Sequence, residues 1–428
     1  MKVLLVGSGG REHALAWKIA QSPSLEQLWA VPGNPGIARH ARCLDLAVDD
    51  GEGIAGFAQS HGVDLVVVGP EQPLVAGLAD ALRARGLVVF GPGARAAAIE
   101  GSKAFAKDLM ARHGIPTARF ATFTDPAAAR RYGRDLGAPC VVKTDGLAAG
   151  KGAIVCATLE EADAAVTLCM ERREFGAAGA SVVIEEFLHG QEVSFFVLVS
   201  GRRAVALAAA QDHKTVFDDD RGPNTGGMGA FSPVTAFDAA LQARVMATIV
   251  EPTIAALAEE AAPYQGVLFV QLMLTKEGPR VVEFNCRFGD PECQVILTRM
   301  EEDLVPLLAA VARGEPPPAP RPGNDAGRAA VCVAVASGGY PGRYGTGHAI
   351  TGIAEAESRP GVHVFHAGTA RRDGRLVTAG GRVLGVTAVA GDLAAAIDAA
   401  YAGVRRIRFE GMHYRTDIGL KALGGRRP

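Results

Sequence analysis

Residues 281–292 (VVEFNCRFGDPE) constrain this chain more than any other segment, because polar and apolar side chains alternate along them. Side chains of a β-strand point to opposite faces in turn, so Glu283, Asn285 and Arg287 would share one face, and apolar residues would occupy the other. A carboxylate, an amide oxygen and a guanidinium in one row can bind a divalent cation and phosphate oxygens. An exposed strand at a sheet edge would give the same alternation, so the segment indicates a nucleotide site only if the rest of the chain supplies a pocket.

Composition and charge exclude several classes of protein. With 428 residues, 48% hydrophobic and 21% charged, the chain has the composition of a globular protein with about three domains. A net charge of −2 and the absence of a Lys/Arg-rich block argue against nucleic acid as a partner. No apolar run approaches a membrane span and the N-terminus has no signal-peptide pattern, so we expect a cytoplasmic protein without membrane association. The seven cysteines show no C-x-x-C spacing, which indicates neither disulfides nor a thiolate zinc site.

The N-terminal segment begins like a dinucleotide-binding fingerprint but departs from it. Residues 2–6 predict a buried strand, and residues 7–13 (GSGGREH) lead into a helix. Glu12 occupies the place of the third glycine of the fingerprint, and the next strand, at 28–31, is followed by no ribose-binding acid. The sequence therefore disfavours NAD as a cofactor.

Glycine and proline follow the predicted strands of this segment. Two further strands, at 63–68 and 87–90, end in Gly-Pro, with an amphipathic helix at 74–85 between them. The pattern predicts a doubly wound parallel sheet, in which the carboxyl ends of the strands form the ligand crevice. Gly10 and Arg11, at the start of a helix, could hold a phosphate there through backbone N–H groups and charge. Tight turns without a ligand would leave the same pattern.

Residues 138–156 (APCVVKTDGLAAGKGAIVC) predict a strand, a glycine-rich loop and a second strand. This is not the phosphate loop that opens a helix, because only three residues separate its first two glycines and a glycine replaces the hydroxyl residue after Lys151. A flexible hairpin tip carrying Lys151, with Lys143 at its stem, can still close over a triphosphate. A plain glycine hairpin with a solvated lysine is the alternative.

Two acidic features lie further along the chain. Glu185 and Glu186 interrupt the apolar strand 181–188, and because unpaired acids are costly to bury, they either face water or are used. Residues 212–230 are rich in glycine and predict a long loop, which inside a compact domain is commonly functional. The acidic run 218–220 resembles a calcium loop only superficially, since a glycine stands in the place of its terminal Glu, so we interpret it as solvated charge.

Helix signals and a proline-rich stretch divide the rest of the chain. Ser102 predicts the N-cap of a helix at 103–113, and a long helix is predicted at 238–260. The proline-rich segment 316–327 predicts a stiff linker and the last domain boundary. Short strands and one clear helix follow in 328–428, which indicates a mixed α+β domain.

Six motifs stand out along these elements: 9–13 (GGREH), 32–36 (PGNPG), 146–152 (GLAAGKG), 211–214 (QDHK), 222–230 (GPNTGGMGA) and 283–292 (EFNCRFGDPE). In this order, the elements and motifs resemble the ATP-grasp superfamily and, more narrowly, the phosphoribosylamine–glycine ligase (glycinamide ribonucleotide synthetase) family. They cover nearly the whole chain. The resemblance implies an ADP-forming carbon–nitrogen ligase of purine biosynthesis, with glycine and 5-phosphoribosylamine as substrates, ATP as co-substrate and Mg²⁺ or Mn²⁺ as the metal. We expect it to be a monomer.

The resemblance also implies a multidomain α/β and α+β fold. A Rossmann-like N-terminal domain (1–101) would face phosphoribosylamine. An ATP-grasp domain (102–315) would follow, with a mobile lid subdomain at about 122–190. The α+β C-terminal domain (328–428) would come after the linker.

Site residues follow from the matching motifs. The residues assigned to ATP are Lys103, Lys143, Gly146, Gly150, Lys151, Gly152, Glu185, Glu186, Phe187 and Glu192, with Glu185 and Phe187 at the adenine edge through backbone groups and Glu192 at the ribose hydroxyls. Those assigned to phosphoribosylamine and glycine are Gly10, Arg11, Glu12, Asn34, Pro35, Gly36, Glu71, Asp212, Lys214, Asn224 and Arg287. The catalytic set is Lys143, Arg287, Asp212 and Asp290. Glu283 and Asn285 would bind the metal.

One position departs from the superfamily pattern, and two alternatives stay open. Many superfamily members carry a further carboxylate on the strand before Glu283, where this chain has Gln271. The chain could be another ATP-grasp ligase acting on a related purine intermediate, or a nucleotide-binding regulator without turnover. A carboxylate is too poor an electrophile for amide formation at neutral pH, so we expect a glycyl phosphate intermediate. No Ser, Cys or His lies in a recognisable nucleophile pattern, so we expect no covalent enzyme intermediate.

Overall fold

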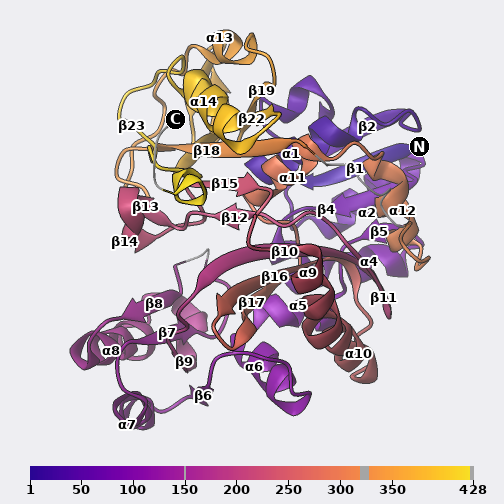
Figure 1. The fold of residues 1–428 in the computed structure, drawn as a ribbon. Coiled ribbons are helices and arrows are strands. Elements are labelled where there is room, and N and C mark those ends of the chain that lie inside the picture. Colours follow the sequence, from indigo (N-terminus) through magenta and orange to yellow (C-terminus); the bar gives the residue numbers. More distant parts are fainter. Residues whose placement is uncertain (149–150, 319–326, 425–428) are drawn as a thin grey trace.

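The computed structural model describes residues 1–148, 151–318 and 327–424, and its N-terminal part is a parallel sheet (Figure 1). The five strands lie in the order β3 (Arg42–Cys43), β2 (Gln27–Pro32), β1 (Lys2–Gly7), β4 (Leu65–Val68), β5 (Val89–Phe90). The helices of this part are α1 (Gly10–Ile19), η1 (Ile37–Arg39), α2 (Gly51–His61), α3 (Glu71–Val75), α4 (Leu78–Ala84) and α5 (Ala94–Gly101). The doubly wound sheet is confirmed, and its order reverses between β1 and β4, where the crevice is expected. The single helix predicted at 74–85 is wrong, because Gly77, with φ +92°, separates α3 from α4.

The second sheet is antiparallel and contains the segment from which the sequence analysis started. Its order is β11 (Arg203–Ala206), β10 (Gln191–Ser200), β16 (Gln265–Thr275), β17 (Gly278–Asn285). The helices that follow or flank it are α6 (Lys103–Arg112), α9 (Ala239–Val245), the π-helix η5 (Met246–Val250), α10 (Glu251–Glu259), α11 (Glu292–Arg299) and α12 (Leu304–Ala312). The predicted strand is confirmed as far as Asn285, and Arg287 lies in the bend beyond it. Ser102 caps α6 as predicted, accepting the N–H of Phe105 at 3.1 Å.

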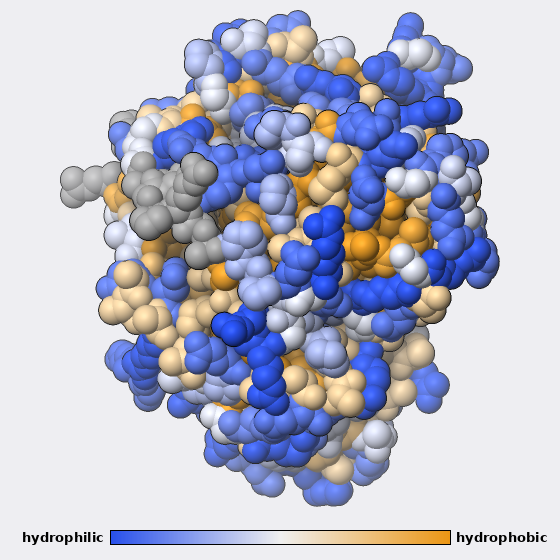
Figure 2. All heavy atoms as spheres, turned by 90° about the vertical axis from the view of Figure 1, so that its right-hand side faces the viewer, coloured by the Kyte–Doolittle hydropathy of each residue, from blue (hydrophilic) through white to orange (hydrophobic). Residues whose placement is uncertain are grey.

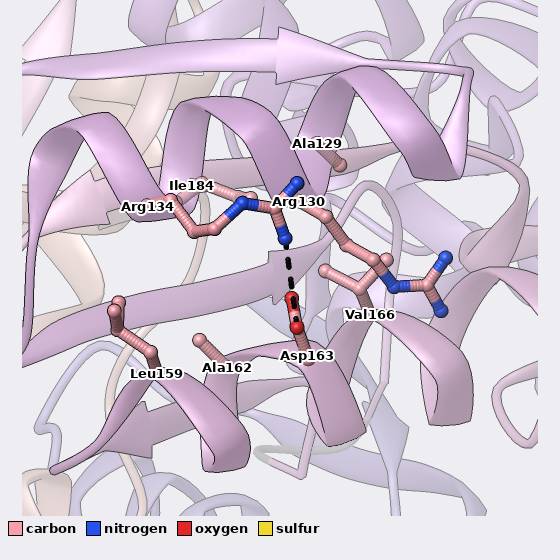
Figure 3. Close-up of a pocket in the computed structure, with 9 residues that line it drawn as sticks. Ala129, Arg130, Arg134, Leu159, Ala162, Asp163, Val166 and Ile184 are labelled. Atoms are coloured by element: carbon pink, nitrogen blue, oxygen red, sulfur yellow. Dashed lines mark ion pairs between the residues drawn. The ribbon is translucent and has the colours of Figure 1, made fainter.

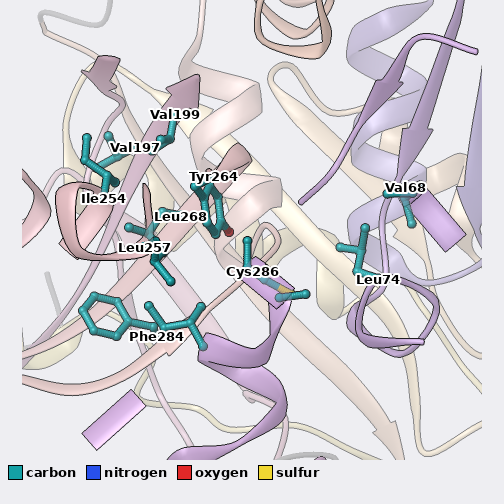
Figure 4. Packing of buried hydrophobic residues seen from close by; sticks show 14 of the residues in the cluster. Val68, Leu74, Val197, Val199, Ile254, Leu257, Tyr264, Leu268, Phe284 and Cys286 are labelled. Carbon is teal, nitrogen blue, oxygen red and sulfur yellow. The ribbon is translucent and has the colours of Figure 1, made fainter. Parts of the chain in front are cut away.

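One hydrophobic cluster extends across these two sheets (Figure 4). The N-terminal domain contributes Val68 and Leu74, and the central sheet contributes Leu268 and Phe284, with Tyr264 just before β16. Each of these side chains is at most 4% exposed. Close packing of this kind resists deformation, so β17 is held firmly against the N-terminal domain.

A smaller unit, residues 120–186, projects from the central sheet at the lower left of Figure 1. Its antiparallel strands lie in the order β6 (Phe120–Phe123), β9 (Val182–Glu186), β7 (Cys140–Thr144), β8 (Ala153–Cys156). Its helices are α7 (Pro126–Leu136), α8 (Leu159–Val166), the π-helix η2 (Thr167–Glu171) and η3 (Gly176–Ala180). The hairpin β7–β8 confirms the predicted strand, loop and strand, although residues 149–150 of the loop lie outside the described residues. This unit has a hydrophobic core of its own, as a lid subdomain requires.

A hollow between α7 and α8 is part of this unit (Figure 3). Aliphatic side chains such as Leu159 and Ile184 line it, and an ion pair between Arg134 and Asp163 (3.7 Å) lies across it. None of the predicted site residues borders this hollow. It is a gap in helix packing and not a candidate active site.

The last sheet joins strands from two distant parts of the chain. Its order is β12 (Gln211–Asp212), β15 (Gly229–Ser232), β18 (Ala329–Ser337), β22 (Arg382–Ala390), β19 (Val362–His366), with β23 (Met412–His413) also pairing with β18. The remaining elements are the hairpins β13 (Thr215–Phe217)–β14 (Arg221–Asn224) and β20 (Thr369–Arg372)–β21 (Arg375–Thr378), the helices α13 (Ile353–Glu357) and α14 (Leu393–Val404), and the 3-10 helix η6 (Leu420–Leu423). The prediction of a long loop at 212–230 is therefore wrong, because the segment contains short strands. Strands of two to four residues are too short to show an alternating pattern in the sequence. The sheet contains strands from both sides of the predicted linker 316–327, most of which lies outside the described residues.

The acidic run of η4 (Asp218–Asp220) fastens the β13–β14 hairpin to the C-terminal segment. Asp218 accepts hydrogen bonds from the backbone N–H (2.7 Å) and the hydroxyl (2.6 Å) of Thr416. Asp220 pairs with the fully buried Arg415 at 3.0 Å. The interpretation as solvated charge is wrong for these two residues, because their partners lie far away in sequence. It holds for Asp219, whose side chain is 80% exposed.

The face on the right-hand side of Figure 1 is mixed in character. Figure 2 shows polar and charged side chains spread over it, with apolar ones in patches between them. Among the described residues, no helix combines the length and the apolar composition that a membrane crossing needs.

Candidate active site

Two buried lysines share one carboxylate at the base of the lid sheet. Glu185, on β9, forms an ion pair with Lys143 of β7 through one oxygen and with Lys107 of α6 through the other. All three side chains are at most 5% exposed. Lys143 also donates a hydrogen bond to the carbonyl of Val282 at 3.1 Å. This contact places its ammonium group beside β17, next to Glu283.

Burial and charge act against each other in this trio. Burial lowers the pKa of Lys107 to about 8, although Glu185 opposes the shift. Burial also acts to raise the pKa of Glu185, but Lys143 and Lys107 outweigh it, so that pKa is lowered. The ionised carboxylate compensates two ammonium groups that would otherwise be buried without a partner. The backbone contact of Glu185 with adenine stays a prediction, whereas its pairing with the lysines was not predicted.

The glycine-rich loop is held at both of its ends. Lys103, at the start of α6, donates a hydrogen bond to the carbonyl of Gly146 at 3.1 Å. At the other end, Lys151 donates to the carbonyl of Pro341, in the C-terminal domain, at 2.8 Å. Gly150 lies outside the described residues. The loop therefore connects α6 to the C-terminal domain across the site.

Other residues predicted for ATP lie on the strands of the lid sheet or directly beside them. Gly152 comes just before β8, where a Cβ atom would lie 2.3 Å from the hydroxyl of Thr144. Glu186, at the end of β9, is half-buried and pairs with Arg280 at 3.0 Å. Phe187 follows directly and is also half-buried. Of the two acids in this strand, Glu185 is thus buried and paired, and Glu186 is paired near the surface.

The carboxylate of Glu283 is half-buried and has no hydrogen-bond or ion-pair partner among the described residues. Burial acts to raise its pKa, but surrounding cations, with Lys214 and Lys143 the strongest, outweigh burial and lower it. Asn285, on the same face, accepts a hydrogen bond from Arg287 at 3.1 Å. Glu283 is therefore an ionised acid that is free to bind a cation.

This donor set fits a single hard divalent cation. In the described part of the chain, no group of three or more His, Cys, Asp or Glu side chains could hold a metal by itself. Mg²⁺ in nucleotide sites takes one or two protein ligands together with phosphate oxygens, which matches Glu283 and Asn285. Gln271, opposite Glu283 in the strand register, is engaged by hydrogen bonds with Ser194 (3.1 Å) and Glu192 (3.1 Å).

A second half-buried acid, Asp212, lies on β12. One carboxylate oxygen of Asp212 is buried and has no hydrogen-bond partner in the described structure. Burial raises the pKa of Asp212 to about 8, with Glu292 and Glu192 adding to the shift and Lys214 opposing it. Lys214 itself pairs with Glu192 at 3.0 Å. Without a bound cation, burial therefore favours the protonated form of Asp212, and a cation bound beside it would favour the ionised form.

The N-terminal crevice holds two arginines among three carboxylates. Arg11 pairs with Glu12 at 2.5 Å and lies 3.7 Å from Glu71. Arg287 bridges Glu71 (3.1 Å) and Glu100 (2.8 Å). Burial acts to raise the pKa of Glu71, but Arg287 and Arg11 outweigh it and hold the pKa at about 2. One charged network thus joins the N-terminal domain to the segment that follows β17.

Glu12 gives the reason for the departure from the dinucleotide fingerprint. Its carboxylate accepts the N–H of Gly9 at 2.7 Å, at the start of α1. A Cβ atom on Gly7 would lie 2.4 Å from the Glu12 side chain, and one on Gly69 would lie 2.3 Å from it. These two glycines make room for an acid where a dinucleotide site would accommodate pyrophosphate.

The side chain of Asn34 is fully engaged within the protein. Its amide oxygen accepts the N–H of Gly36 at 2.8 Å, and its amide nitrogen donates to the carbonyls of Ser8 (2.8 Å) and His366 (2.9 Å). The oxygen accepts a second bond from the next N–H of the turn. A contact between residues 34–36 and phosphoribosylamine would therefore have to use the backbone.

Of two further predicted residues, Asp290 lies beside the crevice and Asn224 does not contact the clusters described above. Asp290 accepts hydrogen bonds from Gln294 (2.7 Å) and from Arg382 (3.0 Å) beside the crevice. Asn224 ends β14, and no side-chain contact among the described residues links it to the clusters above. The contacting residues that sequence reasoning missed are Lys107, Ser194, Glu100, Glu292, Gln294 and Arg382. Of these, only Glu292 and Gln294, at the start of α11 and close in sequence to β17, carried a signal that could have been used.

Comparison with known proteins tests the resemblance. The family models for phosphoribosylglycinamide synthetase match the N domain at residues 1–100, the ATP-grasp domain at 101–293 and the C domain at 330–421. A phosphoribosylamine–glycine ligase of Rhizobium meliloti is 53% identical over 423 residues, covering 99% of each chain. The enzyme of the same name from Pseudomonas aeruginosa is 50% identical and covers 100% of this chain and 99% of its own.

Among solved structures, one match is an enzyme of the same family and another shares only the fold. The phosphoribosylamine–glycine ligase of Thermotoga maritima matches with a TM-score of 0.85 and 33% identity, over 97% of this chain and 100% of its own. The biotin carboxylase domain of Hydrogenobacter thermophilus 2-oxoglutarate carboxylase, solved with MgADP, shares the fold with a TM-score of 0.74 at 16% identity, over 96% of this chain and 91% of its own. The resemblance carried by the motifs is confirmed, and the chain belongs to the phosphoribosylamine–glycine ligase family, with an ATP-grasp central domain.

Proposed function

We propose that this ligase joins glycine to 5-phosphoribosylamine at the expense of ATP, giving glycinamide ribonucleotide, ADP and phosphate in purine biosynthesis. The observation that carries the proposal is the position of β17 and the bend after it. Glu283 lies among lysines, next to the contact between Lys143 and Val282, whereas Arg287 lies between the carboxylates of the N-terminal crevice. One strand thus connects a cluster suited to nucleotide phosphates with a crevice suited to a second substrate.

On the nucleotide side, Lys103 and Lys143 bind the phosphates of ATP. Glu283 and Asn285 would hold Mg²⁺ or Mn²⁺, which would supply positive charge at the transferred phosphoryl group. The glycine-rich loop closes over the phosphates and excludes water, which an acyl phosphate intermediate requires. Phosphate oxygens would compete with Glu185 for Lys143, because both are anions within reach of one ammonium group.

The chemistry proceeds in two steps. A carboxylate is a poor electrophile, so an oxygen of the glycine carboxylate first attacks the γ-phosphorus of ATP, the bond from that phosphorus to the β–γ bridging oxygen breaks, and ADP leaves. The amine of phosphoribosylamine then attacks the carbonyl carbon of glycyl phosphate. The carbon–oxygen bond to phosphate breaks, and the phosphate takes one glycine oxygen and accepts the proton that the amine loses. Catalysis rests on positioning and on the charges of Lys143 and Arg287.

On the amine side, Arg11 lies at the start of α1, where backbone N–H groups and the helix dipole also favour an anion. We assign the phosphate of phosphoribosylamine to this place. Asp212 and Asp290 would face glycine. Asp212 suits an ammonium group because a cation beside it would offset the burial that raises its pKa to about 8.

A coupled assay of ADP release tests the proposal. ADP should form only when glycine and phosphoribosylamine are both present, and formate or bicarbonate should not replace glycine. ADP release with either of these would favour another purine ligase of the superfamily, and no amine-dependent release would favour a regulator. Glycine labelled with ¹⁸O in its carboxylate should deliver one labelled oxygen to inorganic phosphate. Unlabelled phosphate, or AMP and pyrophosphate as products, would contradict the acyl phosphate route.

A further inference from the structure

Arg382, the first residue of β22 in the C-terminal domain, reaches into the candidate active site. Its Nη1 donates hydrogen bonds to three backbone carbonyls, those of Gly226 (2.6 Å), Gly227 (3.2 Å) and Asp290 (2.5 Å). Its Nη2 donates to the carboxylate of Asp290 at 3.0 Å. One guanidinium therefore holds two segments that are far apart in the sequence.

Both segments lie beside the proposed glycine site. Gly226 and Gly227 belong to the turn between β14 and β15, and β15 pairs with β12, which carries Asp212. Asp290 lies between the bend after β17 and the start of α11. The C-terminal domain also holds the turn from its other side, because the N–H of Gly226 donates to the hydroxyl of Tyr340 at 3.1 Å.

The turn is shaped for this contact. A Cβ atom on Gly226 would lie 3.2 Å from the guanidinium carbon of Arg382. Gly227 has φ +112°, and a Cβ atom there would lie 2.6 Å from the ring of Pro291. Only glycines let the backbone approach the arginine and the following segment so closely.

The contact also sets the charge and direction of Asp290. Burial acts to raise the pKa of Asp290, but Arg382 is the strongest of the cations that outweigh burial and lower it. One oxygen accepts from Gln294 at 2.7 Å and the other from Arg382, so the carboxylate cannot rotate freely. The Asp290 side chain is still 19% exposed, which leaves lone pairs for a small cation such as the ammonium group of an amino acid.

We propose that Arg382 is a positioning residue for the amino acid substrate: it fixes Asp290 and the Gly226–Gly227 turn in the arrangement that binds the ammonium end of glycine. The inference rests on the proposed function. Arg382 does not touch the reacting atoms itself. Through Arg382, the C-terminal domain would contribute to the affinity for the amino acid. None of the sequence motifs predicts this contribution.

The test compares Arg382→Met, Arg382→Lys and Arg382→Ala with the wild type in steady-state kinetics, varying each substrate in turn. Arg382→Met should raise the KM for glycine by about 10- to 100-fold, as expected for loss of several charge-assisted hydrogen bonds, and should change the KM for ATP by less than about twofold. The KM of Arg382→Lys for glycine should lie between those of the wild type and Arg382→Met, because an ammonium group keeps the charge but cannot reach all four acceptors. Millimolar guanidinium should restore part of the glycine affinity of Arg382→Ala.

Arg415→Lys is the matched control. Arg415 is a fully buried arginine of the same domain and holds the same 212–230 segment, but through Thr215 and Asp220 and not through Asp290. Its substitution should lower the melting temperature and leave the KM for glycine within about twofold. Equal changes in the KM of all substrates for Arg382→Met, or an unchanged KM for glycine, would overturn the inference. A wild type that releases no ADP with glycine would instead overturn the proposed function.

Discussion

Buried charges are paired differently in the two regions next to β17: the nucleotide side, around Glu283 and Lys143, and the amine side, around Arg287 and Arg11. On the nucleotide side the cations are lysines, and Lys107 and Lys143 share the single carboxylate of Glu185. On the amine side the cations are arginines, and Arg11 and Arg287 are enclosed by several carboxylates. Lysine is a point charge on a flexible stem, whereas arginine has a planar fork that fixes geometry.

The elements that carry the lysines and those that carry the arginines also differ in how firmly they are joined to β17. Lys143 and Glu185 lie on the sheet of the 120–186 unit, which has its own core, so the proposed movement of this unit as a lid would change their distance from β17. The arginine side is part of a network between the N-terminal domain and the segment after β17, which share one hydrophobic core. The comparison suggests an adaptable nucleotide side and a rigid, preformed amine side.

The largest effect should come from Glu283, the free carboxylate on the nucleotide side. Glu283→Gln keeps the shape of the side chain and removes its negative charge, so the proposed metal loses the charged one of its two protein ligands. We expect kcat to fall by roughly 100-fold or more, with smaller changes in substrate KM. Glu277→Gln, in the exposed turn before β17, is the matched control and should leave kcat unchanged. Near-normal kcat of Glu283→Gln at saturating Mg²⁺ would show that the assignment is wrong.

Arg11→Ala should affect the amine side alone. Loss of a guanidinium that binds phosphate should raise the KM for phosphoribosylamine by about 10- to 100-fold, while the KM for ATP stays within about twofold. Arg39→Ala is a control in the same domain, since Arg39 pairs with Glu357 at the surface. An equal or larger rise in the KM for ATP would move this site to the nucleotide and break the comparison.

Two buried, uncharged histidines also join the amine side to the C-terminal domain, and this predicts acid sensitivity. His13 accepts the N–H of His366 at 2.7 Å, and burial lowers the pKa of His366 to about 4 and that of His13 well below its usual value. Both pKa values in the folded protein lie below the value of about 6.5 in the unfolded chain, so the unfolded chain binds more protons. The free energy of unfolding therefore falls as the pH falls from 6.5 towards 4.

Unfolding by urea at pH 7.5 and at pH 5 measures this effect. His366 alone should lower the free energy of unfolding by about 2 kcal/mol between these two values. The pH dependence should be weaker in His366→Gln and unchanged in the control His189→Gln, whose histidine is exposed. Nearby Arg39 and Glu357 act on His366 with opposite sign and do not remove the effect. A wild type that is equally stable at both pH values would contradict the prediction.

Local patterns in the sequence predicted the elements on which this comparison depends. Alternation in 281–288 predicted a strand with Glu283 and Asn285 on one face, and the glycine-rich stretch predicted the β7–β8 hairpin. Both signals are contained in neighbouring residues. The family resemblance added the roles of the residues, which remain proposals.

What could not be predicted depends on contacts between distant residues. The pairing of Glu185 with Lys107 joins a strand to a helix far away in the chain, and nothing local marks Lys107 as a partner. Arg382 meets Asp290 only because β22 lies in a sheet that also includes β15. The short strands of 211–232 form because neighbouring strands of that sheet pair with them, which a single sequence does not show.

The smallest expected effect concerns the mobility of the nucleotide side. With an ATP analogue bound, amide hydrogen exchange should slow by a few-fold across 146–152, since the glycines permit closure and phosphate gives Lys151 a new partner. Peptides from α7, in the same subdomain, should change little, which separates ordering of the loop from stabilisation of the whole lid. Peptides covering 7–13 should not respond to the analogue, because the amine side is already ordered. Unchanged exchange in 146–152 with nucleotide bound would remove the lid from the mechanism, and equal protection in 7–13 would mean that the two sides of β17 do not differ in rigidity.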